Sequence, residues 1–392
     1  MKSMLINFIV IFSIFSVSAQ NDPGRILEQV EDNNSTLKAY RSETDAALIG
    51  NKTGLMPPNP EIEFNYLWGD PAGIGTRTDI SVVQSFDFPT VYSYRAQLAA
   101  MRNEQAELLY QRYRNEMFHQ VRMILAELTY INALVVEYSE RAEHVQQLAD
   151  SYKRMLEVGE TSILEANKAG VNLLGIIGEL EQLKLEQQML LAELERLNGG
   201  NPVNFTNTSF ELMPPELDFE SWYALAEKEN PLLGWLKQQV ELSLKQVQLQ
   251  KALRMPKFHA GYMSEKVVGE QFQGITAGIS IPLWENKQRV NESRALAGVA
   301  VDKEIDARFQ FYSEMKKHYQ KTIALQAQAI AFETQLKTYS NRELLEKALD
   351  AGELSLTEYL IEVSAYYEAI DRMLELKYET LKARYLLRRY EL

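Results

Sequence analysis

Two long stretches without proline set the strongest limit on how this chain can fold. None of its 12 prolines lies between Pro89 and Pro202, and none follows Pro282. Because proline costs roughly 3 kcal/mol inside an α-helix, these stretches are where very long helices are permitted. The first is rich in Ala, Leu, Glu, Gln and Arg, which favour the helix. We therefore expect two helices of about 70 residues, each extending ~100 Å.

Each stretch contains a variant of the same short segment. EVGETSILEA begins at Glu157 and DAGELSLTEY at Asp350, and their glycines, Gly159 and Gly352, are 193 residues apart. Each glycine lies 70 positions after the proline that opens its stretch. Glycine commonly follows the end of a helix because it adopts the left-handed conformation without a steric penalty. The two segments therefore predict tight reversals at the ends of the long helices.

A serine follows each of these glycines by three positions and can cap the next helix. Ser162 is followed three residues later by Glu165, and Ser355 by Glu358. This S-x-x-E pattern predicts a capping box, in which the serine and the acid bond each other's backbone N–H groups. The turns are therefore placed at residues 159–162 and 352–355.

The helix after each turn carries apolar residues that alternate steps of three and four, with one glutamine among them. Such a heptad seam predicts coiled-coil contact with a neighbouring helix, and the alternative is the core of an ordinary helical bundle. The seam consists of Leu173, Ile176, Leu180, Leu183, Gln187, Leu190, Leu194 and Leu197 after the first turn, and of Leu360, Val363, Tyr367, Ile370 and Leu374 after the second.

Each half of the chain also has two short segments in which polar and apolar residues alternate. They span residues 61–68, 79–88, 257–266 and 274–281. The alternation predicts two antiparallel strands in each half. Strands of ~9–11 residues can cross a bilayer when tilted, and aromatic residues such as Trp68 lie near their ends. The alternative is a small soluble sheet with one polar face.

The spacing of matching residues indicates an internal duplication. Pro60 and Pro256 are 196 residues apart, close to the spacing of the two turns. We assign residues 20–199 to a first structural repeat, 200–221 to a connector rich in Gly, Asn and Pro, and 222–392 to a second repeat. Residues 1–19 have a positive start, an apolar run and a small-residue end, which is typical of a secretory signal peptide.

Composition excludes several classes of protein. The formal net charge of −13 argues against nucleic acid as a partner, because such binding needs a basic face. The absence of cysteine excludes disulfides and thiolate metal sites. No stretch after residue 19 is apolar for 18 residues, so no membrane-spanning helix is expected. If the strands lie in a membrane, four cannot close a barrel alone, and a trimer would supply twelve.

Together, the signal peptide, the duplicated proline–strand–loop–strand–proline blocks, the long helices and the paired turns VGETSILE and AGELSLTE resemble the outer-membrane efflux protein family, the TolC-like outer membrane factors of tripartite efflux systems. The resemblance implies a homotrimer in outer-membrane lipid, with a twelve-stranded transmembrane β-barrel. It also implies a periplasmic α-barrel of long-helix coiled-coil hairpins that docks a periplasmic adaptor and an inner-membrane efflux pump. The expected fold class is thus mainly α with a small β part.

The same resemblance implies roles for the turn residues. The adaptor-docking residues would be Gly159, Glu160, Thr161, Ser162, Ile163 and Leu164 in the first turn, and Gly352, Glu353, Leu354, Ser355 and Leu356 in the second. The leucines and Ile163 are expected to remain free to pack against a partner. Glu358, with Glu165 as its counterpart, would face the pore at its closed end, and its alternative role is helix capping alone.

No enzyme signature is present. The segment IGNKTG lacks the spacing of a phosphate-binding loop. The four histidines are scattered, so no metal site and no cofactor are expected. We therefore expect a passive exit duct for small molecules or metal ions that takes its energy from a partner. The alternative is a periplasmic or surface coiled-coil protein with a structural or adhesive role and no channel activity.

Overall fold

The structure is a computed structural model that describes residues 22–210, 218–284, 287–339 and 341–390. The expected signal peptide at residues 1–19 lies outside the described residues, and so does the part of the expected connector at residues 211–217. Among the residues that are described, no helix combines the length and the apolar composition that a membrane span requires.

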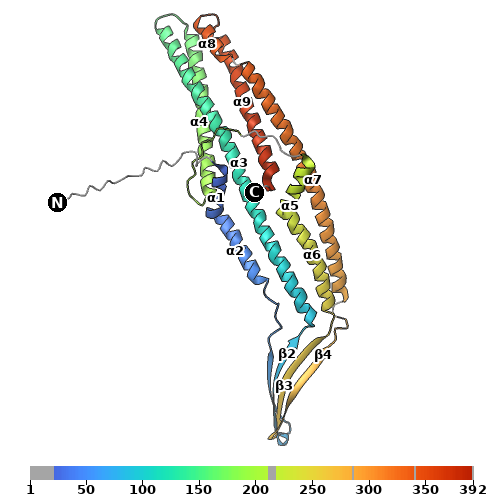
Figure 1. Ribbon diagram of the computed structural model, residues 1–392. Helices are drawn as coiled ribbons and strands as arrows, with labels where there is room; N and C mark the ends of the chain where they lie inside the picture. The colour runs from blue at the N-terminus through green and yellow to red at the C-terminus, as the bar shows by residue number, and fades with distance from the viewer. Residues whose placement is uncertain (1–21, 211–217, 285–286, 340, 391–392) are drawn as a thin grey trace, which may run out of the picture. The chain divides into compact units, whose positions relative to one another are not determined.

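Helices and strands follow each other in nearly the same order in both halves of the chain (Figure 1). The first half contains α1 (Pro23–Asn33), α2 (Ser35–Gly50), β1 (Glu61–Trp68), β2 (Thr76–Phe86), α3 (Pro89–Glu157) and α4 (Ile163–Leu197). The second contains α5 (Phe219–Glu229), α6 (Pro231–Ala252), β3 (Lys257–Val267), β4 (Glu270–Ser280), α7 (Lys287–Thr338), α8 (Arg342–Asp350) and α9 (Leu356–Leu387). The predicted class, mainly α with a small β part, is confirmed.

The two long helices differ from each other. α3 runs without interruption for 69 residues from Pro89, as expected. The expectation of an equally long second helix is wrong, because α7 covers 52 residues and ends at Thr338, and α8 then begins at Arg342. The residues between them, 339–341, are Tyr-Ser-Asn, none of which is a strong helix former. α5 also begins earlier than expected, at Phe219.

The chain forms two compact units, and α2, α3 and α7 contribute residues to both. We call the unit made of residues 22–36, 116–210 and 317–389 the helical unit. The strand unit comprises residues 37–115, the described part of 218–316, and Tyr390.

The core of the helical unit begins where α1 packs against α3 and α4. Its buried members are Ile26, Leu27 and Val30 of α1, Phe118, Val121, Ile124, Leu125 and Leu128 of α3, Leu194 and Leu197 of α4, and Phe205 of the connector. The Asn34 side-chain amide donates a 2.7 Å hydrogen bond to the Leu197 carbonyl, so the end of α1 meets the end of α4. The connector is held against α3, because the Asn132 amide donates to the carbonyls of Phe205 and Asn207.

The two predicted seams face neighbouring helices of the helical unit. Every residue of both seams is buried or half-buried, including Leu180 and Leu194 on α4 and Val363 and Leu374 on α9. Leu374 packs with Ala133 and Leu134 of α3. The coiled-coil character expected from the heptad spacing is therefore confirmed.

The helices of the strand unit pack through a separate apolar cluster. Val91 and Leu98 of α3 are buried against Leu249 and Ala252 of α6. Aromatic rings join α5 to α7, since the Tyr223 ring lies 5.7 Å from that of Phe311.

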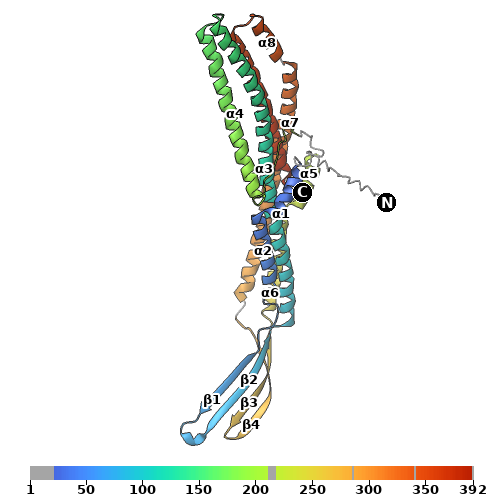
Figure 2. The ribbon, with the colours of Figure 1, turned by 90° about the vertical axis from the view of Figure 1, so that its left-hand side faces the viewer.

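Four strands form one antiparallel sheet in the order β1-β2-β3-β4, which Figure 2 shows side by side. β2 and β3 come from different halves of the chain and pair over ten residues, from Arg77 with Val267 to Phe86 with Phe258. β1 and β4 are the outer strands of this sheet, and each has one edge without a strand partner among the described residues.

Two strands, β2 and β4, begin earlier than predicted. β2 covers Thr76–Phe86 rather than 79–88, because it pairs with both neighbours from its first residues and the Asp87 N–H donates to the Tyr92 hydroxyl instead of a strand. β4 begins at Glu270 rather than 274, since a two-residue turn at Val268 and Gly269 joins it to β3. Both turn residues have positive φ, 49° and 94°, which is the geometry of a type I′ hairpin turn.

Candidate functional site: the paired turns, their grooves and the two faces of the sheet

In both reversals, the helix before the turn ends with the same hydrogen-bond pattern. In the first, the Glu160 N–H donates to the Met155 carbonyl at 2.8 Å and the Gly159 N–H to Leu156 at 3.2 Å. In the second, Glu353 and Gly352 bond Ala348 and Leu349 in the same way. Gly159 and Gly352 have φ of +80° and +74°, as this Schellman motif requires. Figure 1 places the two turns at the same end of the helical unit.

The two capping serines are in place, but the two acids behave differently. Ser355 and Glu358 form the full predicted box, in which the Glu358 carboxylate accepts from the Ser355 N–H at 2.9 Å. Ser162 caps the N–H of Glu165, yet the Glu165 carboxylate accepts from the Thr161 hydroxyl at 2.8 Å. The prediction of a complete box in the first turn is therefore wrong, because a threonine is available there as a competing donor.

The apolar side chains of the two turns are not equally available to a partner. Ile163 and Leu164 in the first turn are 62% and 70% exposed. Leu354 is half-buried, and Leu356 is only 1% exposed. The expectation that Leu356 remains free is wrong, since this first residue of α9 points into the protein. Any docking surface here draws its apolar area mainly from the first turn.

Glu358 has its charge fixed by local bonds. Hydrogen bonds from the Ser355 side chain and backbone lower the pKa of the exposed Glu358 carboxyl. The structure thus places Glu358 in the capping role at the start of α9. Its role at a pore stays a prediction, and so does that of Glu165.

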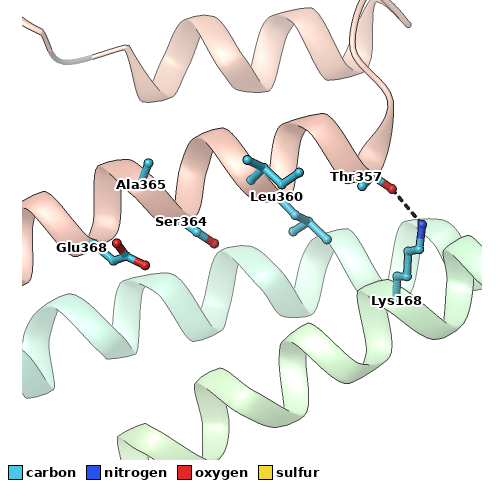
Figure 3. A pocket seen from close by; sticks show the side chains of 7 residues that line it. Lys168, Thr357, Leu360, Ser364, Ala365 and Glu368 are labelled. Carbon is cyan, nitrogen blue, oxygen red and sulfur yellow. Dashed lines mark hydrogen bonds between the residues drawn. The ribbon is translucent and has the colours of Figure 1, made fainter.

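A groove runs between α4 and α9 just beyond the turns, with a volume of about 440 Å³ (Figure 3). Lys168 of α4 donates a 2.8 Å hydrogen bond to the Thr357 hydroxyl of α9 across it. The rest of its α9 side is lined by Leu360, Ile361, Ser364, Ala365 and Glu368. A second groove of about 320 Å³ lies between α9 and the end of α7, and it shares Ala365. The heptad pattern predicted neither groove, since both depend on how neighbouring helices diverge.

The register of the sheet separates its residues into two faces. Paired residues share a face and successive residues alternate between faces. One face is apolar and exposed, and it carries Ile62, Phe64, Tyr66, Trp68, Ile80, Val82, Phe86, Phe258, Tyr262, Ile275 and Ile279. The opposite face holds most of the charged residues, and there Arg77 pairs with Asp79 at 2.9 Å and with Glu265 at 3.1 Å.

A buried ion pair joins the two repeats in the helical unit, and no sequence pattern indicated it. Arg141 of α3 is 2% exposed and binds both carboxylate oxygens of Asp371 of α9, at 2.6 and 3.0 Å. The rings of Tyr138 and Tyr367 lie 4.5 and 4.4 Å from its guanidinium carbon, and the Tyr138 hydroxyl donates to Asp371. The contact spans residues more than 200 positions apart, so periodicity cannot reveal it.

Two histidines of α3 are partly buried in the helical unit. Burial, with the positive charges of Arg389 and Arg122, lowers the pKa of His119 to about 4. His144 contacts α8 and α9. Among the described residues, no three His, Asp or Glu side chains gather in a way that could hold a metal ion.

Comparison with known proteins shows which solved structures share this fold. No model of a known protein family matches the chain, and no curated protein matches it significantly. The Campylobacter jejuni CmeC outer membrane channel matches with a TM-score of 0.74 and 15% identity, over 94% of this chain and 85% of CmeC. The outer membrane protein VceC of Vibrio cholerae gives 0.77 and 12%, over 94% and 95%. The open state of the Neisseria gonorrhoeae MtrE outer membrane channel gives 0.59 and 11%, over 94% and 88%.

These matches and the geometry together define the class of the protein. It is a duplicated protein of long helical hairpins with a four-stranded antiparallel sheet. More specifically, the chain has the fold of the solved outer-membrane channels, over nearly its whole length. The resemblance expected from the paired turns is confirmed at the level of fold.

Proposed function

We propose that the chain is a subunit of an outer-membrane exit duct, a passive trimeric channel of a tripartite efflux system. The observation that carries the proposal is the sheet, which has one exposed apolar face, one charged face and two open edges. It is joined to long helical hairpins in a fold that solved outer-membrane channels share. Each feature corresponds to one requirement of such a duct.

The apolar face suits contact with lipid. Ile275, 89% exposed, belongs to a row of large apolar side chains that crosses all four strands through Tyr262, Val82 and Ile62. Trp68, 78% exposed, lies on the same face. Contiguous apolar patches of this kind are rare on soluble monomers and indicate contact with a partner or a membrane. The opposite face, with Arg77, Asp79 and Glu265, suits a water-filled interior.

The edges of β1 and β4, which have no strand partner in the described part of the chain, support assembly of several copies. Unpaired backbone groups cannot face lipid, because each would lose its hydrogen bonds to water without replacement. If β1 of one copy pairs with β4 of the next, three copies close a cylinder of twelve strands, a size known among outer-membrane proteins. The helical hairpins of the three copies would continue the passage in the periplasm. The repeats would keep the boundaries 20–199 and 222–392.

The turns and the two grooves beside α9 would dock the periplasmic adaptor. Ile163 and Leu164 would supply the apolar contact, and the groove crossed by Lys168 and Thr357 would receive a helix of the partner. The adaptor would link the duct to an inner-membrane pump, which would supply energy and choose the small molecules or metal ions to be exported. We expect Leu164→Asp to abolish export while the trimer still forms. Unchanged export in this variant would refute the docking assignment.

Glu358 would also contribute to an acidic ring at the closed end of the duct. Three copies of an exposed, ionised carboxylate around one axis would favour cations. In planar bilayers, Glu358→Gln channels should be less selective for cations than the parent protein. Unchanged selectivity would leave Glu358 as a helix cap only.

Two neighbouring residues of β4 offer a matched test of the membrane assignment. Ile275 lies on the apolar face and Thr276 on the opposite face. An arginine facing lipid near the middle of a bilayer costs about 2–4 kcal/mol, whereas interior positions tolerate it. We expect Ile275→Arg to lose the outer-membrane trimer and its conductance in planar bilayers, and Thr276→Arg to keep both. A water-soluble monomer that both substitutions leave unchanged would instead support the structural or adhesive alternative.

A further inference from the structure

His144 lies where three helices of the helical unit meet near the second turn. An apolar cluster there joins Tyr359 of α9 to Leu345 and Leu349 of α8 and to Leu148 of α3. His144 of α3 borders this cluster, with its Nε2 atom 2.6 Å from the Tyr359 hydroxyl and its Nδ1 atom 3.7 Å from a Glu346 carboxylate oxygen of α8. The imidazole therefore contacts both helices that flank the Gly352 turn.

The contacts identify the form of His144 that this packing needs. Tyr359 is 1% exposed, and burial raises the pKa of Tyr359 well above its ordinary value, so the hydroxyl keeps its proton. Among the described residues, His144 is the only hydrogen-bond partner of that hydroxyl. A phenol that donates to Nε2 requires a neutral imidazole with its own proton on Nδ1, on the side of Glu346.

We propose that protonation of His144 loosens α8 from α3 and α9, so that the end of the second helical hairpin responds to pH. A charged imidazole carries a proton on both nitrogens, so Nε2 can no longer accept from Tyr359. The hydroxyl must then turn its proton into an apolar cluster that offers it no acceptor. A buried donor without a partner is destabilising. Release of α8, whose Leu345 and Leu349 pack in the Tyr359 cluster, relieves this cost because water can then reach the hydroxyl.

Some charged groups around His144 favour its protonated form and others oppose it. From α8, Glu346 and Asp350 favour the charged imidazole, while Arg342 opposes it and occupies Glu346 through a 3.0 Å bond. α9 presents the neutral Tyr359. Burial is the largest effect, and it lowers the pKa of His144 below its ordinary value of 6.5. The packing is therefore at full strength above that pH and weakens as the pH falls below it.

α8 is well placed to pass on this change. It ends at Asp350, two residues before Gly352, and the Glu353 N–H bonds the carbonyl of Ala348 within α8. A loosened α8 would therefore free the second turn, whatever substrate the protein carries.

Hydrogen exchange of the full-length protein in detergent tests this device at pH 7.5 and 5.5, with rates corrected for the intrinsic effect of pH. We expect the protection of residues 342–350 to fall several-fold at pH 5.5, with a ceiling of about tenfold because that pH lies one unit below the ordinary pKa. Residues 163–197 of α4 serve as the internal reference, and the loss at residues 342–350 is read relative to any loss there. Equal protection of residues 342–350 at both pH values would overturn the proposal.

Three variants assign the effect to a side chain. His144→Gln can still accept from Tyr359 but does not titrate, so its residues 342–350 should show no pH response. His119→Gln removes the other partly buried histidine of α3 and should respond like the parent. Tyr359→Phe keeps the ring and removes the stranded proton, so its response should shrink. A full response in His144→Gln, or in Tyr359→Phe if the first variant does not fold, would refute the assignment.

Discussion

Arg141 and Asp371 form an ion pair whose two partners are buried to different extents. We therefore expect removal of one partner to destabilise the protein more than removal of the other. Arg141 is 2% exposed, whereas the Asp371 side chain is 29% exposed. Replacing Asp371 by leucine leaves a guanidinium that water cannot reach, with only the Tyr367 carbonyl at 3.4 Å and a Glu137 carboxylate oxygen at 3.9 Å beside it. Replacing Arg141 by methionine leaves a carboxylate that water can still reach and that keeps the Tyr138 hydroxyl. The first substitution should therefore be the more damaging.

The magnitudes follow from these contacts. Removing one partner of a buried pair typically costs 3–5 kcal/mol, so Asp371→Leu should cost about 4 kcal/mol. Arg141→Met loses two cation–π contacts and the pair but strands no buried charge, so we expect about 2 kcal/mol. In the double variant both charges are gone, and the unbonded Arg141 Nε–H is removed as well. Its cost should be about 1–2 kcal/mol, because apolar replacements of a whole buried pair are often nearly neutral.

Hydrogen exchange of α9 residues 363–376 measures these costs locally. A loss of about 4 kcal/mol lowers protection roughly 700-fold, since each 1.4 kcal/mol is a factor of ten. We expect a loss of roughly 700-fold for Asp371→Leu, roughly thirtyfold for Arg141→Met, and near tenfold for the double variant. An equal or milder effect of Asp371→Leu, or additive effects in the double variant, would refute the reasoning.

Three further predictions concern the helical unit. Leu356→Ala should lower the free energy of unfolding by about 2–5 kcal/mol because the Leu356 side chain is buried. Leu164→Ala should change it by no more than about 0.5 kcal/mol and should instead weaken export. Thermal unfolding and transport assays measure the two effects. Since the pKa of His119 is lowered to about 4, stability should fall by up to about 1.4 kcal/mol per pH unit between about 6.5 and 4, and His119→Gln should flatten that slope in unfolding curves. Ser355→Ala, which breaks a reciprocal box, should cost about 1 kcal/mol and more than Ser162→Ala, and equal unfolding midpoints would contradict this.

Local patterns were sufficient to predict the first long helix, the helix after each turn, the seams and the two reversals. A glycine that ends a helix, a serine that caps the next one and a heptad seam act within a few residues of each other, so the sequence around Gly159 and Gly352 indicates its structure directly. The paired alternating segments likewise predicted four antiparallel strands. Composition and spacing together were enough for the fold class.

Features that depend on distant or weak contacts could not be predicted. The break after Thr338 falls where only three residues of low helix propensity follow one another, and the turn at Val268 has a residue type that rarely adopts positive φ. The burial of Leu356 depends on the packing of α9, and the pairing of Arg141 with Asp371 joins the two halves of the chain. Each requires knowledge of which helices are neighbours, which periodicity alone does not provide.

The central claim is that strands of different copies complete one another, and cysteine cross-linking tests it directly. The chain has no native cysteine, so one cysteine in β1 and one in β4 report only on the contact between these strands. The scan places one cysteine at or next to Asn65 of β1 and the other at or next to Phe272 of β4. At least one such pair should give covalent trimers in the outer membrane. If no cysteine pair at any register gives a covalent species larger than a monomer, the account is contradicted.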